Sequence, residues 1–335
     1  MTQTKTPLTQ IARALWYVDR ELVALHEEEL NLHIGASDVL VETLYSGLSR
    51  GTERLVYFGA IPTSERETMR APLQMGNFPF PVKYGYCAVG IIRKGPQSLW
   101  NRVAFCLHPH QDFFVAPAST ITLVPPGLSP KRATLAANME TAINAHWDAQ
   151  TAVGDRIIVI GAGIVGLLTA YVASRIPGTE VTLVDVNPAQ RTLAQKLDIP
   201  FSSPAEMPAD ADVVFHTSAS EAGLQAAIDV AGFEGRIIEM SWFGSRGVTL
   251  GLGGQFHSKR LQLISSQVGQ VAAPRRPRWT YGRRLAKAID LLDDPRLDCL
   301  VADEIPFDRL PELLPRVFSD DAAGLPPVIR YGSEA

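Results

Sequence analysis

The chain has 335 residues, of which 46% are hydrophobic and 20% charged, and this balance excludes an intrinsically disordered protein. Lysine and arginine number 31 against 35 acidic residues, and the net charge of -4 argues against a protein that binds nucleic acid. Three cysteines without a CxxC spacing exclude a disulfide scaffold, and the length predicts about two domains.

Neither a secretory signal nor a membrane span is predicted. The first 30 residues lack the apolar stretch and cleavage site of a signal peptide. Residues 157–174 carry no charge but contain three glycines, so a strand, a glycine turn and a buried helix explain them better than a membrane span. We therefore expect a cytoplasmic protein.

Short strands and turns dominate the first 125 residues. Residues 13–18 and 22–26 are typical of a hairpin around Asp19-Arg20. Further strands are predicted at 39–45, 87–93, 102–106 and 113–116, and glycines and prolines separate them. The pattern indicates a β-rich domain with short connections.

From Ser129 onward the hydrophobic period changes. Ser129 and Pro130 suit the cap and first turn of a helix that continues over 131–148. Strands at 156–160, 180–184, 212–216, 235–240 and 261–266 then alternate with helices at 164–176, 189–197 and 221–231. This alternation predicts an α/β fold with a doubly wound parallel sheet. A last helix is predicted at 281–292 and a last strand at 328–331.

A glycine motif follows the strand at 156–160 and opens the next helix. Gly161, Gly163 and Gly166 form a GxGxxG pattern in the strand–turn–helix context that dinucleotide sites require. Gly161 permits the tight turn, Gly163 allows close approach of a pyrophosphate, and Gly166 allows the helix to pack on the strand. The N–H groups at the helix start, where Ile164 and Val165 lie, would face the phosphates.

An acidic residue ends the following strand. Asp185 lies 24 residues after Gly161, where a carboxylate accepts hydrogen bonds from the adenosine ribose and repels a 2′-phosphate. The sequence therefore predicts NAD rather than NADP, the alternative being a Rossmann domain that has lost its nucleotide. Ser218, Ser241 and Trp242 follow later strands and are either cofactor contacts or ordinary loop residues.

The β-rich N-terminal part, the GAGIVG unit at 161–166 and the returning C-terminal segment together resemble the medium-chain dehydrogenase/reductase superfamily. The resemblance implies a GroES-like catalytic domain of residues 1–139, completed by 271–335, and a Rossmann domain of residues 140–270. It also implies a small-molecule substrate and a homodimer, paired through the edge strand at 261–266.

Zinc-dependent members of this superfamily carry Gly-x-Cys-x-Thr/Ser-Asp and Gly-His-Glu motifs. The matching stretches here are 47–53 and 85–87, where Ser49 replaces the ligand cysteine and Tyr86 replaces the ligand histidine. The third ligand position falls near Ala137, and the four-cysteine structural lobe has no counterpart. Because a catalytic zinc needs three protein ligands, we predict no metal.

One stretch narrows the resemblance further. Residues 46–55 (SGLSRGTERL) resemble a signature of the bacteriochlorophyllide a dehydrogenase branch, whose members oxidise a hydroxyethyl substituent to acetyl with NAD. Residues 61–80 are longer than expected for that branch, which indicates a different substrate.

Several polar residues are candidates for chemistry without zinc. Thr52 matches the proton-relay hydroxyl of the superfamily, and Glu53 is either a base or a residue that orients Arg50 or a backbone turn. Arg50 is assigned to the cofactor. Tyr86 either hydrogen-bonds a substrate oxygen or is a packed aromatic, and Glu140 is either a proton-exchanging carboxylate or a paired structural acid.

Two further groups leave alternatives open. His108 and His110 are each either a base or a hydrogen-bonded loop histidine. A run of arginines in residues 275–284 is either a solvated face or a recognition element for an anionic substrate or the cofactor phosphates.

Taken together, these residues predict a zinc-independent, NAD-dependent oxidoreductase that interconverts a secondary alcohol and a ketone by hydride transfer. The first alternative is an NADPH-dependent enone or quinone reductase, against which Asp185 argues. The second is a dinucleotide-binding protein without turnover.

Overall fold

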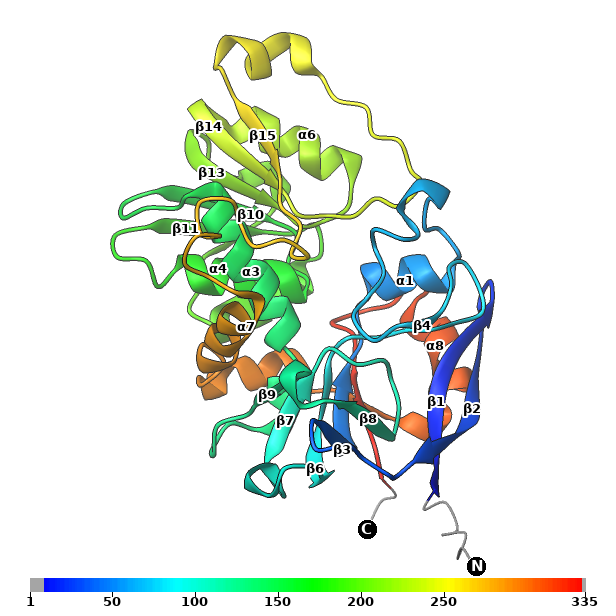
Figure 1. Cartoon of the computed structure of the whole chain (residues 1–335). Coiled ribbons are helices and arrows are strands. Elements are labelled where there is room, and N and C mark those ends of the chain that lie inside the picture. Colours follow the sequence, from blue (N-terminus) through cyan, green and yellow to red (C-terminus); the bar gives the residue numbers. More distant parts are fainter. Residues whose placement is uncertain (1–8, 333–335) are drawn as a thin grey trace, which may run out of the picture. The chain divides into compact units, whose positions relative to one another are not determined.

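The computed structural model describes residues 9–332 and divides the chain into two compact units (Figure 1). The terminal unit joins the N-terminal part of the chain, up to Leu135, to the C-terminal part from Val301 onward. The central unit is the continuous segment Ala136–Leu300.

Two sheets build the terminal unit, one with four strands in the order β2-β1-β5-β4 and one that runs β16-β17-β3-β6-β7-β9, with β8 also paired to β3. The predicted hairpin is confirmed, since β1 and β2 pair antiparallel. The strands are β1 (Thr9–Asp19), β2 (Leu22–Asn31), β3 (Asp38–Gly47), β4 (Met75–Gly76), β5 (Val82–Lys83), β6 (Ala88–Lys94), β7 (Val103–Cys106), β8 (Phe113–Pro117), β9 (Ile121–Leu123), β16 (Glu304–Pro306) and β17 (Val328–Arg330).

The C-terminal segment completes the larger of these sheets. Strand β17 pairs antiparallel with β3, with Val328 opposite Gly47. On β3 Val39 and Val41 lie on one face and belong to a core cluster with Ile92 and Phe114. Leu40 between them is buried as well, so both faces of this stretch of β3 are covered. The helices of this unit are α1 (Thr52–Tyr57), α2 (Pro130–Ala133) and α8 (Leu310–Val317).

The central unit contains the predicted doubly wound sheet. Six strands, all parallel, run in the order β12-β11-β10-β13-β14-β15. They are β10 (Arg156–Ile160), β11 (Glu180–Val184), β12 (Phe201–Ser202), β13 (Ala211–His216), β14 (Ala231–Glu239) and β15 (Gln262–Ser265). The helices are α3 (Ala136–Ala149), α4 (Ile164–Ala173), α5 (Arg191–Lys196), α6 (Glu221–Val230) and α7 (Tyr281–Asp290).

Short helical turns connect these elements in both units. The 3₁₀ turns are Thr63–Glu65, Gln97–Leu99, Ala118–Thr120, Pro188–Gln190, Pro204–Glu206, Pro295–Val301 and Phe307–Arg309, and a π-helical turn covers Leu252–Phe256. Among residues 9–332, none of the helices combines the length and apolar character that crossing a membrane requires.

The single helix predicted at 131–148 is two helices in the structure, and this prediction was wrong. Helix α2 ends at Ala133 because Thr134 and Leu135 bond back three residues, to the carbonyls of Lys131 and Arg132. Such three-residue bonds tighten and close a last turn. Ser129 does precede α2 with Pro130 in the first turn, but its side chain makes no capping hydrogen bond.

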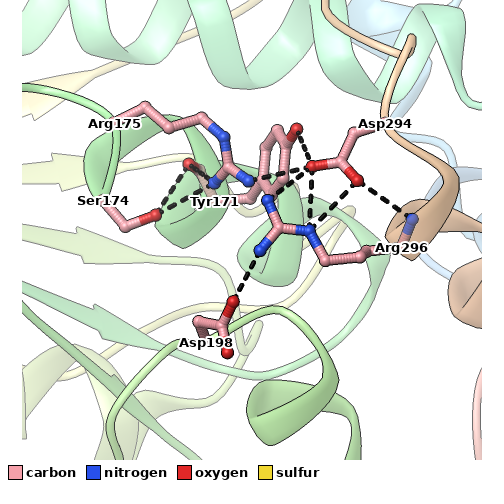
Figure 2. Close-up of polar contacts among 6 residues, drawn as sticks. All are labelled: Tyr171, Ser174, Arg175, Asp198, Asp294 and Arg296. Carbon is pink, nitrogen blue, oxygen red and sulfur yellow. Dashed lines mark hydrogen bonds and ion pairs between the residues drawn. The ribbon is translucent and has the colours of Figure 1, made fainter.

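Residues 271–300, assigned from the sequence to the catalytic domain, belong to the central unit. Helix α7 is joined to α3 by a buried ion pair between Arg284 and Glu140. The segment after α7 is fixed by a second cluster, in which Asp294 accepts hydrogen bonds from two arginines and a tyrosine (Figure 2). The residues of this cluster are Tyr171, Ser174, Arg175, Asp198, Asp294 and Arg296.

Candidate functional site

The glycine turn joins β10 to α4. Gly161 has φ +106, a backbone conformation that favours glycine, and a Cβ there would lie 2.8 Å from the Ser218 amide nitrogen. A Cβ on Gly166 would lie 1.8 Å from the Gly161 carbonyl oxygen. Gly163 differs, because it is exposed and a Cβ there would meet nothing within 4 Å. The fold itself therefore needs glycine at positions 161 and 166, whereas Gly163 leaves open space beside the turn.

Asp185 lies beside this turn, directly after β11. Its Oδ2 accepts a hydrogen bond from the Ala162 N–H at 2.6 Å, and its Oδ1 accepts one from the Asn187 N–H at 2.8 Å. The first N–H groups of α4, around Ile164 and Val165, have no intrahelical acceptor and lie at the positive end of the helix dipole. A fixed carboxylate and free N–H donors fit the ribose and pyrophosphate of a dinucleotide.

Two predicted serines lie at the same sheet edge. Ser218 is exposed. The backbone of Ser218 touches the glycine turn, because a Cβ on Gly161 would lie 2.8 Å from the Ser218 amide nitrogen. Ser241 accepts a hydrogen bond from the Ala219 N–H at 3.0 Å, and Trp242 follows it, half-buried. The structure brings the serines together, and their cofactor role stays a prediction.

A buried polar cluster lies in the terminal unit, centred on Glu53. Glu53 is fully buried and its Oε2 accepts hydrogen bonds from Tyr17 Oη at 3.0 Å and from His110 Nε2 at 2.8 Å. Its Oε1 accepts the Ser49 N–H at 2.8 Å, and the Glu53 N–H donates to the Ser49 carbonyl. This reciprocal pairing resembles a capping box and holds the turn that begins α1. Of the roles predicted for Glu53, the structure shows the orientation of a backbone turn.

The cluster continues through His110. His110 Nδ1 lies 2.7 Å from Ser46 Oγ, which lies 2.8 Å from Tyr331 Oη. With the Nε2 proton directed at Glu53, Nδ1 accepts from Ser46 and Ser46 accepts from Tyr331. Burial, followed by the charge of Glu53, raises the pKa of Tyr17, and burial raises that of Tyr331.

Sequence reasoning named His110 only as one of two loop histidines and missed the other members of this cluster. Tyr17, Ser46 and Tyr331 come from β1, from β3 and from the residue after β17. Ser46 opens the 46–55 stretch, but no local motif marks its partners, because the contacts that join the cluster are 36 to 285 residues apart in sequence.

Three hydroxyl groups gather where the resemblance places metal ligands and a proton relay. Burial raises the pKa of Tyr86, and hydrogen bonds with Ser49 and Thr52 oppose that rise. Ser49 Oγ also accepts the Thr52 N–H at 3.2 Å. Tyr86, Ser49 and Thr52 are all partly exposed, unlike Glu53. The structure therefore brings together Thr52 and Tyr86, two of the residues predicted to be catalytic.

Two other predicted residues have structural partners. Arg50 donates hydrogen bonds to the carbonyls of Ala322 at 3.2 Å and Gly324 at 2.7 Å, so it anchors the C-terminal segment. Glu140 accepts from Arg284 at 2.9 Å inside the central unit. Burial raises the pKa of Glu140 and Arg284 opposes the rise. Glu140 is thus a paired structural acid, the second of the two roles predicted for it from the sequence.

His108 is packed rather than poised for proton transfer. Its ring stacks on Phe114 with centroids 3.9 Å apart, and burial lowers its pKa to about 3, so it is neutral at pH 7. In the arginine run, Arg275 lies over Trp147 and Arg283 over Trp279, both exposed arginines on the surface of the central unit.

The residues at the expected zinc position do not fit a catalytic zinc site. Ser49 and Tyr86 occupy two ligand positions, and neither provides the thiolate or imidazole of the zinc-dependent members. Within residues 9–332, no group of three or more His, Cys, Asp or Glu side chains is placed to hold a metal ion.

Comparison with known proteins gives a consistent picture of the fold. No protein-family model matches the chain. The 2-dehydro-3-deoxy-L-galactonate 5-dehydrogenase of Pseudoalteromonas atlantica is 26% identical over 173 residues, which are 48% of this chain and 50% of that protein. The chain thus spans about half the length of the curated relatives that it matches.

Solved structures match almost the whole chain. L-idonate 5-dehydrogenase from Escherichia coli superimposes with a TM-score of 0.78 at 14% identity, covering 98% of this chain and 99% of that one. A protein of Sinorhizobium meliloti, described as a zinc-binding dehydrogenase and solved with NADP, gives a TM-score of 0.74 at 15% identity, covering 96% and 99%.

These likenesses show an α/β fold that combines a GroES-like part with a Rossmann-type part. They support the resemblance to medium-chain dehydrogenases at the level of the superfamily. They do not support the bacteriochlorophyllide branch, and they do not support the loss of zinc.

Proposed function

We propose that the protein is a zinc-independent, NAD-dependent oxidoreductase that interconverts a secondary alcohol and a ketone. The observation that carries the proposal is the hydroxyl cluster of Ser49, Thr52 and Tyr86, which occupies the expected ligand and relay positions and rests on the buried Glu53. The relative and the solved neighbour named above are both 5-dehydrogenases by name, which supports dehydrogenation of a small molecule.

The cofactor part of the proposal rests on the central unit. The nicotinamide of the bound cofactor would accept or deliver the hydride. Asp185 and the first turn of α4 would hold the ribose and the pyrophosphate beside Gly163. The carboxylate of Asp185 repels a 2′-phosphate, which favours NAD, whereas a neighbour of the same fold was solved with NADP.

We assign the substrate oxygen to the hydroxyl cluster. Since burial raises the pKa of Tyr86, its phenol keeps its proton at neutral pH and acts as a hydrogen-bond donor to a ketone oxygen. Thr52 would pass the hydroxyl proton onward. Glu53 acts as a positioning residue, because it has no exposed surface and fixes the turn that carries Ser49 and Thr52.

The test is turnover of the purified full chain with a panel of secondary alcohols, including sugar acids, followed by the absorbance of the reduced cofactor. We expect activity with NAD that survives treatment with a metal chelator. Tyr86→Phe is expected to lower kcat/KM about 100-fold without changing the affinity for NAD. Tyr84→Phe is the matched control, a buried tyrosine whose ring packs edge-on against Tyr86 at 6.0 Å.

Three results would overturn parts of this proposal. Loss of activity with the chelator and its recovery with zinc would refute zinc independence. Activity with NADPH and enones alone would establish the reductase alternative. Tight NAD binding without turnover across the panel would establish a binding protein.

A further inference from the structure

A second hydrogen-bonded constellation lies in the central unit, at the carboxyl edge of the parallel sheet. His216 and Glu239 are the last residues of the neighbouring strands β13 and β14 and are paired in their register. Glu239 Oε2 lies 2.7 Å from His216 Nδ1, and Ser218 Oγ lies 2.7 Å from His216 Nε2. A carboxylate, an imidazole and a hydroxyl are thus joined in sequence at hydrogen-bond distance.

A neutral His216 imidazole and an ionised Glu239 give one consistent assignment of the protons in these contacts. The Gly223 N–H donates to Ser220 Oγ at 3.0 Å, so the Ser220 hydroxyl is free to donate to Ser218 Oγ, 2.9 Å away. Because Nδ1 of a neutral imidazole must carry its proton to face Glu239, Nε2 is left as the acceptor for the Ser218 hydroxyl. The hydrogen bonds therefore all point toward Glu239, which polarises the Ser218 hydroxyl.

The three hydrogen-bonded residues differ in solvent exposure as nucleophilic catalysis requires, with a buried base and an exposed hydroxyl. His216 is fully buried, whereas Ser218 is exposed. The Ser241 N–H fixes the other oxygen of Glu239 at 2.6 Å, so the carboxylate cannot rotate away from the imidazole. A nucleophile bonded to a base, which is itself oriented by a third group, is the geometric signature of an activated serine.

Helix α6 is packed to leave room for this serine. A Cβ on Gly223 would lie 2.4 Å from Ser218 Oγ, so glycine at this helical position permits the close approach. The first turn of α6, at Glu221 and Ala222, presents N–H groups at the positive end of a helix dipole. Such groups stabilise the oxyanion that develops when a hydroxyl attacks a carbonyl.

We propose that Ser218, His216 and Glu239 form an acyl-transfer site that hydrolyses small carboxylic esters. Ser218 Oγ bonds to the acyl carbon while its proton moves to His216 Nε2. The bond from the acyl carbon to the alcohol oxygen breaks, and the leaving alcohol takes that proton. Water then bonds to the acyl carbon and gives a proton to His216 Nε2. The bond from the acyl carbon to Ser218 Oγ breaks, Oγ takes that proton from His216, and the acid is released. Glu239 is a positioning residue that holds the imidazole.

This site is next to the glycine turn, so we expect NAD to compete with the ester substrate. The Ser218 amide nitrogen lies 2.8 Å from the position of a Cβ on Gly161, in the turn assigned to the dinucleotide. The proposal does not depend on hydride transfer, because ester hydrolysis is measured in the absence of any nicotinamide cofactor. Protection by NAD is a separate measurement.

The test uses the full chain with p-nitrophenyl acetate as substrate and a fluorophosphonate as covalent probe, with the labelled residue located by peptide mass spectrometry. We expect labelling at Ser218, and Ser218→Ala is expected to lower hydrolysis about 100-fold or more. Ser203→Ala is the matched control, since Ser203 Oγ hydrogen-bonds the Glu206 carboxylate at 3.3 Å, and no bond to an imidazole is seen within residues 9–332. Glu239→Gln is expected to lower kcat and leave KM unchanged.

The opposite results overturn the proposal. Hydrolysis that is equal in the parent, Ser218→Ala and Ser203→Ala proteins would show only background reactivity. Labelling at a residue other than Ser218 would exclude Ser218 as the nucleophile. Circular dichroism of each variant tests whether it is folded, and we expect Ser218→Ala to fold because it changes an exposed side chain.

Discussion

Replacing Gly166 by alanine should separate the packing role of the glycine turn from its binding role. The added Cβ would lie 1.8 Å from the Gly161 carbonyl oxygen, which is a backbone atom that no side-chain rotation can move. Alanine gains about 1 kcal/mol over glycine in helix propensity. Overpacking of a rigid interior costs about 1–3 kcal/mol, and this contact belongs at or above the upper end of that range.

We therefore expect Gly166→Ala to lower the free energy of unfolding by about 2 kcal/mol, and the midpoint of thermal unfolding by about 4–8 °C. Gly163→Ala is the matched control, because its Cβ would meet nothing within 4 Å and its φ of -72 suits alanine. We expect the control to keep the stability of the parent protein and to lose affinity for NAD, since the methyl group fills space that we assign to the pyrophosphate.

Differential scanning calorimetry measures the stability of both variants, and titration calorimetry measures their affinity for NAD. Equal unfolding temperatures for Gly166→Ala and the parent would refute the packing argument. Unchanged NAD affinity in Gly163→Ala would refute the assignment of the open space.

Three further predictions concern the buried polar groups. Glu53→Ala leaves Tyr17, His110 and the Ser49 N–H without their acceptor. We expect the free energy of unfolding, measured by urea denaturation, to fall by at least about 3 kcal/mol. A fall below about 1 kcal/mol would contradict the hydrogen-bond network around Glu53. Glu140→Ala removes the carboxylate that pairs with the buried Arg284, whose guanidinium keeps its hydrogen bonds to Asn144 and to the carbonyls of Val268 and Gln270, and we expect a loss of about 3 kcal/mol. The double variant Glu140→Leu with Arg284→Met should recover only part of that loss, because it also removes those other hydrogen bonds; a single variant as stable as the parent would contradict the pairing. Burial lowers the pKa of His108 from 6.5 to about 3, so below pH 6.5 the unfolded chain binds a proton at this residue that the folded chain does not. The free energy of unfolding therefore falls as the pH drops from 6.5 toward 3, and in His108→Leu this fall should be shallower by up to about 1.4 kcal/mol per pH unit. Equal slopes of unfolding free energy against pH in the variant and the parent would exclude the effect.

Five of the six strands described in the central unit were predicted, because their signal is local, whereas the two-residue strand β12 was not. Residues 156–160 and 180–184 are found as strands with the predicted bounds, since each is a short apolar run with a turn at its end. The end of α2 was not predictable, because the sequence from Lys131 to Ala149 has no glycine or proline to mark a break. Nor was the place of residues 271–300, which depends on the contact of Arg284 with Glu140, 144 residues away.

The candidate site divides in the same way. The glycine turn and Asp185 were predicted from a motif whose spacing is fixed by the βαβ unit. The contacts of Glu53 with Tyr17 and His110, and those of His216 with Glu239, join segments that are brought together only in the folded protein. Arg50 and Glu140 show the converse, since a charged residue near a motif has a structural partner that its local sequence does not reveal.

The pairing of β17 with β3 has a consequence for synthesis on the ribosome. The central unit is one continuous segment and can fold while the chain is still being made. Strand β8 covers residues 38–42 of β3 early, but residues 45–47 must wait for residues 328–330 before their edge is covered, and Ser46 must wait for Tyr331. During that interval the end of β3 presents a short unpaired edge of the kind that aggregates. We therefore expect the N-terminal part of the nascent chain to be more prone to aggregation than its middle.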